Sequence, residues 1–222
     1  MRPKVKICGI TNLIDAKNAL HFGADFIGFI NIEQSPRFLS IDQIAEISRD
    51  LSEKEKQQSV LLSLEHSVDS LVSHLIRLGF KIVQPYGNLS MEDMSKLKLM
   101  GYKIFKPVRI ASEADIKNLG ELRKSVDLII LDSKEEGSEV LGGTGKVFNW
   151  DIFNQAKEEL EIELALSGGL NLENIEEALA KTKATMIDLS SGLEQSPGIK
   201  SCDKIKGLFN SFLTTSSTDL QN

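Results

Sequence analysis

The sequence has few of the features that assign a chain to a specialised class of protein. Its 222 residues include two cysteines, Cys8 and Cys202, which are too few for a disulfide framework and belong to no Cys/His cluster with metal-ligand spacing. It has no apolar run long enough for a signal-peptide core or a membrane span, since Gly9 and Asp15 interrupt the apolar residues that follow Lys6. We therefore expect free thiols, a cytoplasmic location, no metal site and no membrane partner.

The chain also has fewer basic than acidic residues. The chain has 26 lysines and arginines against 32 aspartates and glutamates, a formal net charge of -6, and its lysines are scattered among glutamates. Binding to a nucleic-acid backbone needs a clustered basic face, so we expect no nucleic-acid partner. The hydrophobic fraction of 41% and the charged fraction of 26% are ordinary for a globular protein with a buried core.

Short apolar or β-branched runs alternate with longer amphipathic segments along the chain. The runs predict strands and the segments between them predict helices. Because each crossover is long enough for a helix, the strands should pair in parallel, and eight such units predict a single-domain (β/α)8 TIM barrel. The predicted strands are residues 5–8, 26–30, 60–64, 81–84, 102–107, 126–132, 162–167 and 185–189, and the predicted helices include residues 13–22, 42–51, 68–78 and 175–181.

An open, doubly wound α/β sheet is the rival architecture. Two observations favour the closed barrel: the strand–helix units are close to the minimum length, and no Pro/Gly/Ser-rich linker or shift in composition divides the chain. We expect one barrel domain over residues 1–213 and a polar C-terminal tail over residues 214–222.

The residues that can carry chemistry fall where the predicted strands end. In a parallel barrel these ends share one rim, which is where the active sites of this fold lie. We therefore expect one site built from all of these clusters. They are Cys8-Gly9, Ser35-Pro36-Arg37, Gln84-Pro85-Tyr86-Gly87, Asp132, residues 142–150, Ser167-Gly168-Gly169 and residues 188–194.

Two loops of small residues follow the predicted seventh and eighth strands, Ser167-Gly168-Gly169 and Ser190-Ser191-Gly192. Bare backbone N–H groups in such loops, together with a following helix N-terminus, bind anions, and phosphate commonly binds at this place in barrels. A simpler interpretation, in which the glycines only make tight turns, explains two adjacent loops less well. The loops predict a phosphate-bearing substrate.

Taken together, these motifs resemble phosphoribosylanthranilate isomerase, the barrel enzyme of tryptophan biosynthesis. The family's reaction is an Amadori rearrangement of N-(5-phosphoribosyl)anthranilate, in which the furanose opens and an aminoaldose becomes an aminoketose. The resemblance implies a small-molecule phosphosugar substrate and no metal or organic cofactor. The resemblance covers nearly the whole chain. The motifs that carry it are KICGIT at Lys6, GADFIGF at Gly23, SPRFLS at Ser35, LDS at Leu131, GGTGKVFNW at Gly142, LSGGLNLENI at Leu166 and DLSSGLEQSPGIKS at Asp188.

The resemblance also implies roles for individual residues. Cys8 would be the base that takes the proton from C2 of the sugar, and Asp132 the acid that protonates the ring oxygen. Arg37 would pair with the anthranilate carboxylate, and Asp188 would orient the substrate or pair with Lys6. The remaining implied residues are the phosphate ligands Gly168, Gly169, Ser190, Ser191 and Gly192, and the loop over the substrate, with Gly142, Gly143, Gly145 and Lys146.

That loop invites another interpretation, because GGTGK resembles a nucleotide-binding P-loop. The P-loop pattern needs a glycine where Val140 stands and a Ser or Thr where Val147 follows Lys146. We therefore exclude a P-loop.

Both implied catalytic groups need a shifted pKa, because an unperturbed thiol titrates at about 8.5 and an unperturbed aspartate at about 3.9. Lys6 lies two positions before Cys8, so strand alternation puts both side chains on the same face. Its ammonium would lower the pKa of the thiol. For Asp132, the apolar residues 128–131 would raise the pKa by removing water.

Simpler roles exist for each of these residues. Cys8 could be a small buried hydrophobe, Asp132 a helix N-cap or turn residue, Arg37 a solvated surface residue and Asp188 half of a structural ion pair. The position of each within the longer motifs favours the functional role.

Two other functions stay open. The segments 31–34 and 63–66, together with Pro85 and Tyr86, depart from the family's usual pattern, which fits a non-catalytic phosphosugar-binding or regulatory barrel. A third possibility is an isomerase acting on a related phosphosugar, although the corresponding family of histidine biosynthesis has an aspartate in place of Cys8. Fold alone does not decide among these, and the sequence is compatible with either a monomer or a homodimer.

Overall fold

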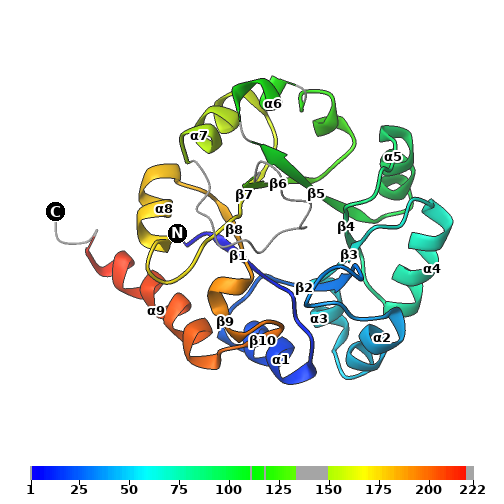
Figure 1. Ribbon diagram of the computed structural model, residues 1–222, viewed down its shortest axis with the longest axis horizontal. Coiled ribbons are helices and arrows are strands. Elements are labelled where there is room, and N and C mark those ends of the chain that lie inside the picture. The colour runs from blue at the N-terminus through cyan, green and yellow to red at the C-terminus, as the bar shows by residue number, and fades with distance from the viewer. Residues whose placement is uncertain (1, 111, 118, 134–149, 219–222) are drawn as a thin grey trace.

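The structure is a computed structural model that describes residues 2–110, 112–117, 119–133 and 150–218. Eight parallel strands close into a barrel in the order of the sequence (Figure 1). The fold is a single-domain (β/α)8 barrel, as predicted, and not an open sheet. Its strands are β1 (Lys4–Cys8), β2 (Phe26–Asn31), β3 (Ser59–Ser63), β4 (Ile82–Pro85), β5 (Lys103–Ile110), β6 (Leu128–Ser133), β7 (Leu164–Leu166) and β8 (Met186–Leu189).

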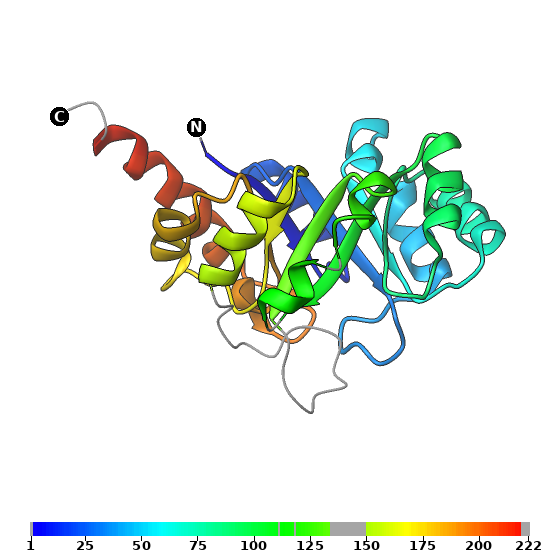
Figure 2. The same cartoon turned by 90° about the horizontal axis from the view of Figure 1, so that it is seen from above.

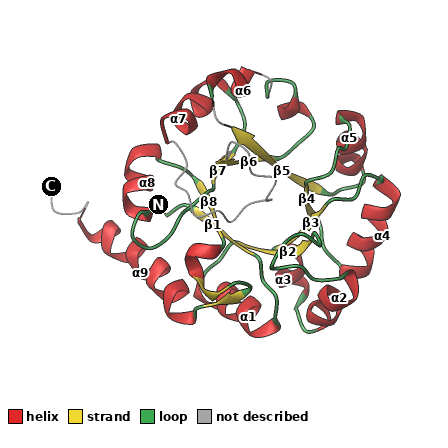
Figure 3. Cartoon of the chain, viewed as in Figure 1, coloured by secondary structure: helices red, strands yellow, loops and turns green. Residues whose placement is uncertain are grey.

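Helices surround the barrel on the outside (Figure 3). Several begin at a serine whose side chain accepts from the backbone N–H three residues later, while the side chain at that position bonds back to the serine. This reciprocal cap satisfies two backbone donors at the helix start. The helices are α1 (Leu13–Phe22), α2 (Ile41–Arg49), α3 (Glu53–Gln57), α4 (Val68–Leu78), α5 (Met91–Leu99), α6 (Glu113–Lys117), α7 (Trp150–Glu159), α8 (Ile175–Thr182) and α9 (Cys202–Thr218), with single 3₁₀ turns at Leu122–Lys124 and Ser191–Leu193.

Strand alternation divides the buried side chains into two layers. One layer packs between the strands and the helices, as Val83 of β4 does. The other fills the barrel interior, where Ile82 packs in the same cluster as Cys8 of β1 and Leu62 of β3. Successive residues of a strand point to opposite faces, so Lys6 and Cys8 both point inward.

The strand bounds differ slightly from those predicted, since β5 continues past residue 107 to Ile110 and β7 covers only the middle of the predicted 162–167. A hairpin of β9 (Glu194–Ser196) and β10 (Ile199–Lys200) was not predicted. Figure 2 shows this hairpin (orange) at the end of the barrel opposite the N-terminus, which is the end where the parallel strands finish. Its strands are too short to show a periodic pattern in the sequence.

Helix α9 packs against α1 and continues to Thr218, past residue 213, where the domain was predicted to end. The boundary itself stays a prediction. Over the residues that the structure describes, no helix is both long enough and apolar enough to cross a membrane.

Candidate active site

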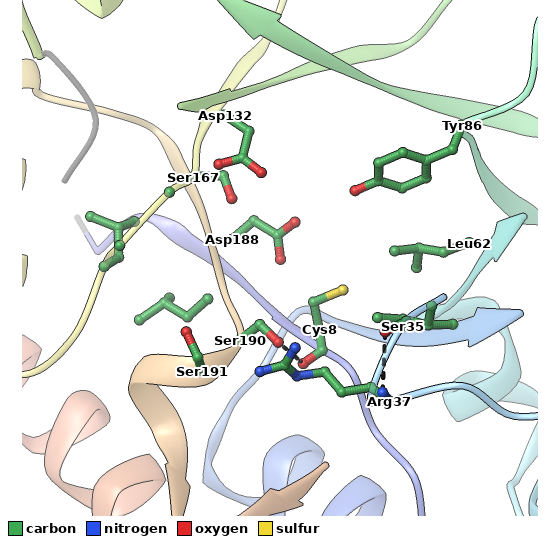
Figure 4. A pocket seen from close by; sticks show the side chains of 15 residues that line it. Cys8, Ser35, Arg37, Leu62, Tyr86, Asp132, Ser167, Asp188, Ser190 and Ser191 are labelled. Atoms are coloured by element: carbon green, nitrogen blue, oxygen red, sulfur yellow. Dashed lines mark hydrogen bonds between the residues drawn. The ribbon is translucent and has the colours of Figure 1, made fainter. Parts of the chain in front are cut away.

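A cavity opens at the carboxyl ends of the barrel strands (Figure 4). Cys8, Arg37, Asp132 and Asp188 all line it, so the structure brings together four side chains that the sequence places far apart. The two small-residue loops also reach it. The other lining residues are Ile30, Ser35, Leu62, Tyr86, Ser167, Gly168, Gly169, Leu170, Leu189, Ser190 and Ser191.

Lys6 and Asp188 form a buried ion pair below this cavity. Their strands are neighbours, and the register aligns Lys6 with Asp188; Lys6 Nζ lies 2.7 Å from Asp188 Oδ2, with the lysine side chain fully buried. The predicted pairing of the two residues is therefore confirmed. The second carboxylate oxygen, Asp188 Oδ1, is buried and has no hydrogen-bond partner among the described residues. A buried acceptor of this kind is costly unless a donor reaches it.

The Cys8 thiol lies at the end of β1, and 7% of the residue is exposed. Burial raises its pKa; Lys6 acts in the opposite direction, but Asp188 raises the pKa further. Lys6 lowers the pKa of the thiol, as expected, but burial and Asp188 outweigh it, so the net pKa lies above the ordinary value. Lys6 shares its charge with Asp188, and the remaining attraction does not offset the loss of water around a thiolate.

Asp132 lies in β6, one residue before the end of the strand, and is half-buried. It is therefore neither a helix N-cap nor a turn residue. Figure 4 shows its carboxylate pointing into the cavity from the side opposite Tyr86. Cys8 and Asp132 come from β1 and β6, which are separated along the closed barrel by β7 and β8, and both face the space between them.

Arg37 is buried against the cavity and is not a solvated surface residue. Its Nε and Nη2 each donate to a carboxylate oxygen of Glu194 at 2.7 Å, in the two-pronged geometry that a guanidinium favours. The side chains of Arg37 and Glu194 are 8% and 5% exposed. These two bonds leave out Nη1, the third guanidinium nitrogen, which is the part of Arg37 that can meet a ligand.

Glu194 belongs to the predicted cluster 188–194 but had no predicted role, and Lys200 was not predicted as a site residue. Lys200 Nζ donates to Glu194 Oε1 at 2.8 Å and to the Ser190 carbonyl at 3.2 Å. Burial alone would raise the pKa of Glu194, but the hydrogen bonds and charges of Arg37 and Lys200 bring it below its ordinary value. Both residues lie within the motif that begins at Asp188, yet nothing in that motif shows that a hairpin folds back onto Arg37.

The two predicted phosphate loops lie side by side in the cavity. Gly168 and Gly169 have φ values of +89° and +67°, in the left-handed region that favours glycine. Gly192 does not line the cavity but packs the loops together: a Cβ there would lie 2.1 Å from the Leu170 carbonyl oxygen. Ser190 Oγ donates to the Cys8 carbonyl at 3.0 Å and ties the second loop to β1.

Asn171 holds the turn between the first loop and helix α8. Asn171 Oδ1 accepts from the backbone N–H groups of Glu173 and Asn174 at 2.8 and 3.2 Å. Asn174, the N-cap residue of α8, makes no side-chain capping bond to that helix, so the expected contribution of the helix to anion binding stays a prediction.

The predicted loop over the substrate, with Gly142, Gly143, Gly145 and Lys146, lies outside the described residues. In the part of the chain that is described, no group of three or more His, Cys, Asp or Glu side chains is arranged to hold a metal ion.

A parallel barrel with ionisable side chains and two small-residue loops at the carboxyl ends of its strands is the architecture of barrel enzymes. The family model of N-(5'-phosphoribosyl)anthranilate (PRA) isomerase matches residues 5–211. The chain belongs to the N-(5'-phosphoribosyl)anthranilate isomerase family, as its motifs suggested.

Individual relatives agree over nearly the full length. The N-(5'-phosphoribosyl)anthranilate isomerase of Agrobacterium fabrum is 33% identical over 212 residues, covering 95% of this chain and 94% of the relative. The crystal structure of phosphoribosyl anthranilate isomerase from Thermotoga maritima superposes with a TM-score of 0.82 at 30% identity, covering 96% of this chain and 99% of that one. A phosphoribosyl anthranilate isomerase in complex with reduced 1-(o-carboxyphenylamino)-1-deoxyribulose 5-phosphate has a TM-score of 0.78 at 28% identity, covering 94% and 97%.

Proposed function

We propose that this protein converts N-(5'-phosphoribosyl)anthranilate into 1-(2-carboxyphenylamino)-1-deoxyribulose 5-phosphate, a step of tryptophan biosynthesis. The observation that carries the proposal is a single cavity, in a chain of this family, into which a thiol, a carboxylate and two small-residue loops all point. A family structure that holds a reduced product analogue supports the same class of ligand.

The first step opens the sugar ring. The anthranilate nitrogen forms a double bond to C1 as the bond between C1 and the ring oxygen breaks, and Asp132 gives its proton to that oxygen. The intermediate is a protonated imine, with its positive charge next to C2. Asp132 suits this role because it is half-buried at the end of its strand and points into the cavity.

The second step moves the proton from C2. The Cys8 thiolate takes it, the electrons of the C–H bond form a C1–C2 double bond, and the imine nitrogen becomes neutral. The resulting enol gains a proton at C1 and loses the proton of its C2 hydroxyl, which gives the ketone. These two transfers balance the proton that Cys8 took and the proton that Asp132 gave, so the overall reaction is an isomerisation without an external oxidant or reductant. The cationic imine favours the thiolate at this stage, which offsets the effect of burial on the pKa of Cys8.

Three groups hold the substrate in this proposal. The backbone of Gly168, Gly169, Ser190 and Ser191 surrounds the 5'-phosphate. Asp188 Oδ1, which is buried with no partner among the described residues, accepts a hydrogen bond from the substrate. Arg37 pairs with the anthranilate carboxylate through Nη1, the nitrogen that its bonds to Glu194 leave out.

The test is fluorescence-monitored conversion of freshly generated N-(5'-phosphoribosyl)anthranilate. Cys8→Ser and Asp132→Asn should each lower kcat by about 10²- to 10⁴-fold, the usual effect of removing a general acid or base. Cys202→Ser is the matched control, since Cys202 is the other cysteine and is exposed. A wild-type protein that binds the phosphosugar without turning it over would rule out the isomerase and favour a binding barrel.

A further inference from the structure

Tyr86 lies on the side of the cavity away from the two phosphate loops. It follows β4, whereas the loops follow β7 and β8; in the closed order of eight strands β4 is directly opposite β8. Its ring packs in the barrel-interior cluster that also contains Cys8, Ile30 and Leu62. Figure 4 shows its hydroxyl pointing across the cavity toward Asp188 and Asp132.

The hydroxyl of Tyr86 is set up to donate a hydrogen bond. Gln84 is buried, and its Nε2 donates to the Tyr86 oxygen at 3.1 Å. A phenol has one proton, and this contact uses the oxygen as an acceptor. The proton of Tyr86 can therefore point into the cavity.

The phenol also stays neutral. Burial raises its pKa well above the ordinary value, and the negative charges of Cys8, Asp132 and Asp188 raise it further. A neutral phenol keeps its proton across the pH range in which an isomerase works.

The position of the phosphate decides which end of the substrate Tyr86 meets. With the 5'-phosphate in the loops after β7 and β8, the ribose spans the space between Cys8 and Asp132. The arylamine at C1 then extends to the far side, where Leu62, Ile30 and the ring of Tyr86 provide apolar surface. An aromatic substrate ring and a polar substituent match a wall of this composition.

We propose that Tyr86 is a specificity-determining residue that donates a hydrogen bond to the anthranilate end of the substrate and packs its ring against the substrate's aromatic ring. This inference rests on the proposed function. It assigns a role to the Pro85-Tyr86 segment, in which the sequence departs from the usual family pattern.

The test compares two ligands in Tyr86→Phe. Calorimetric binding of reduced 1-(o-carboxyphenylamino)-1-deoxyribulose 5-phosphate should weaken by about 3- to 10-fold, the usual effect of losing one buried hydrogen bond. Binding of ribose 5-phosphate, which lacks the arylamine, should change by less than about 2-fold. In steady-state kinetics the KM should rise more than kcat falls, because the hydroxyl positions the substrate and exchanges no proton with it.

Tyr102→Phe is the matched control. Tyr102 is the other tyrosine of the chain, is buried in the outer layer between strands and helices, and does not line the cavity. It should leave both affinities unchanged. Equal weakening of the two ligands in Tyr86→Phe, or no weakening of either, would overturn the proposed role of Tyr86.

Failure of the proposed function gives a different pattern. If the wild type binds the arylamine analogue but does not turn over the substrate, the isomerase proposal fails while the ligand comparison still decides the role of Tyr86. If the wild type does not bind the arylamine analogue but does bind ribose 5-phosphate, the role of Tyr86 is overturned.

Discussion

The chemical properties of individual side chains in this barrel depend on the residues that surround them. Lys6 and Cys8 share a strand face, yet Lys6 is paired with Asp188 at 2.7 Å, and the thiol is left with a raised pKa. In the proposed mechanism, burial therefore favours the neutral thiol of Cys8 before the substrate binds. Without substrate, the positive charge nearest to Cys8 on its own strand, that of Lys6, is paired with Asp188. A cationic imine beside Cys8 would supply a second positive charge.

The raised pKa of Cys8 can be measured directly. In a Cys202→Ser variant Cys8 is the remaining thiol, and its ultraviolet thiolate absorbance should appear only at a higher pH than that of free cysteine in the same buffer. The sign follows from burial, which disfavours the charged form. The double variant without either cysteine supplies the baseline for the tyrosines. A transition centred near pH 7 would contradict this prediction and mean that Lys6 outweighs burial.

The position of Arg37 depends on Glu194. Glu194→Gln removes one of the two accepting oxygens and the negative charge that Arg37 and Lys200 share. We expect the KM for the anthranilate substrate to rise by about 10-fold with a smaller fall in kcat, because a charge-assisted hydrogen bond contributes about 1.5 to 3 kcal/mol.

Glu161→Gln is the control for this substitution, since Glu161 forms an ion pair with Arg123 on the surface with its own side chain 87% exposed. Steady-state kinetics and ribose 5-phosphate binding distinguish a displaced Arg37 from general damage to the site. If Glu194→Gln weakened ribose 5-phosphate as much as it raised the KM, the effect would be on the whole site and not on Arg37.

At the scale of elements, the site is assembled by loops that pack on one another. The hairpin of β9 and β10 carries Glu194 and Lys200 back over the end of β1, and the loop after β8 lies against the loop after β7. In the proposed function, these contacts place the backbone around the substrate's phosphate without any long side chain. Small residues are required because larger ones would separate the two loops.

Gly192 is the residue at which this close approach can be tested. In Gly192→Ala the new Cβ would lie 2.1 Å from the Leu170 oxygen and 2.9 Å from the Asn171 Cα, and backbone atoms cannot rotate away. We expect a loss of about 1 to 3 kcal/mol in the free energy of unfolding, as for other overpacked sites, together with weaker binding of inorganic phosphate.

Gly120→Ala is the comparison for Gly192, because its nearest neighbouring atom would be 4.0 Å from the new Cβ. Urea denaturation gives the stabilities of both variants and calorimetry gives the phosphate affinities. A Gly192→Ala protein with unchanged phosphate affinity would show that the spacing of the two loops does not matter for binding.

At the scale of the whole molecule, the pairing of β1 with β8, which closes the barrel, also contributes to the site. Strands β1 and β8 pair there, and the register that aligns Lys6 with Asp188 places their ion pair inside the barrel, with Asp188 Oδ1 buried and without a hydrogen-bond partner among the described residues. On the same strand Lys4 makes an ion pair with Glu163 on the surface. The two lysines therefore allow a buried pair and an exposed pair to be compared within one strand.

Lys6→Met should lower the free energy of unfolding by about 3 to 5 kcal/mol at neutral pH, because it leaves the Asp188 carboxylate buried and unpaired. Lys4→Met should lower it by less than about 1 kcal/mol. Burial already raises the pKa of Asp188 in the wild type. Without Lys6 the folded state binds a proton more readily than the unfolded state, so the variant regains stability as the pH falls.

Denaturant titrations of both lysine variants at pH 5 and pH 8 provide the measurement. The deficit of Lys6→Met should be smaller at pH 5, whereas that of Lys4→Met should change little. Equal losses in the two variants would mean that the buried pair contributes no more than the surface pair does.

The sequence alone indicated much of this architecture, since strand alternation and crossover length are local properties. It identified Cys8, Asp132, Arg37 and Asp188, and the structure places all four in one cavity. The pairing of Lys6 with Asp188 could also be predicted, because in a closed barrel the first and last strands must be neighbours.

Other features depended on contacts between residues distant in sequence. The partner of Arg37 and the net pKa shift of Cys8 each depend on how side chains are buried together, which no local pattern records. The roles implied for the catalytic and binding residues stay predictions until they are measured.

By itself, then, the sequence determined the order of the elements, the family and the residues at the strand ends, because these follow from periodicity and from motifs along the chain. Only the tertiary structure decided which charges neutralise each other, since Glu194 reaches Arg37 across 157 positions of sequence. It also placed Tyr86 opposite the phosphate loops. Closing the barrel brings such residues together and removes water from them. The loss of water lowers the local dielectric constant and so strengthens the interactions between charges in the site.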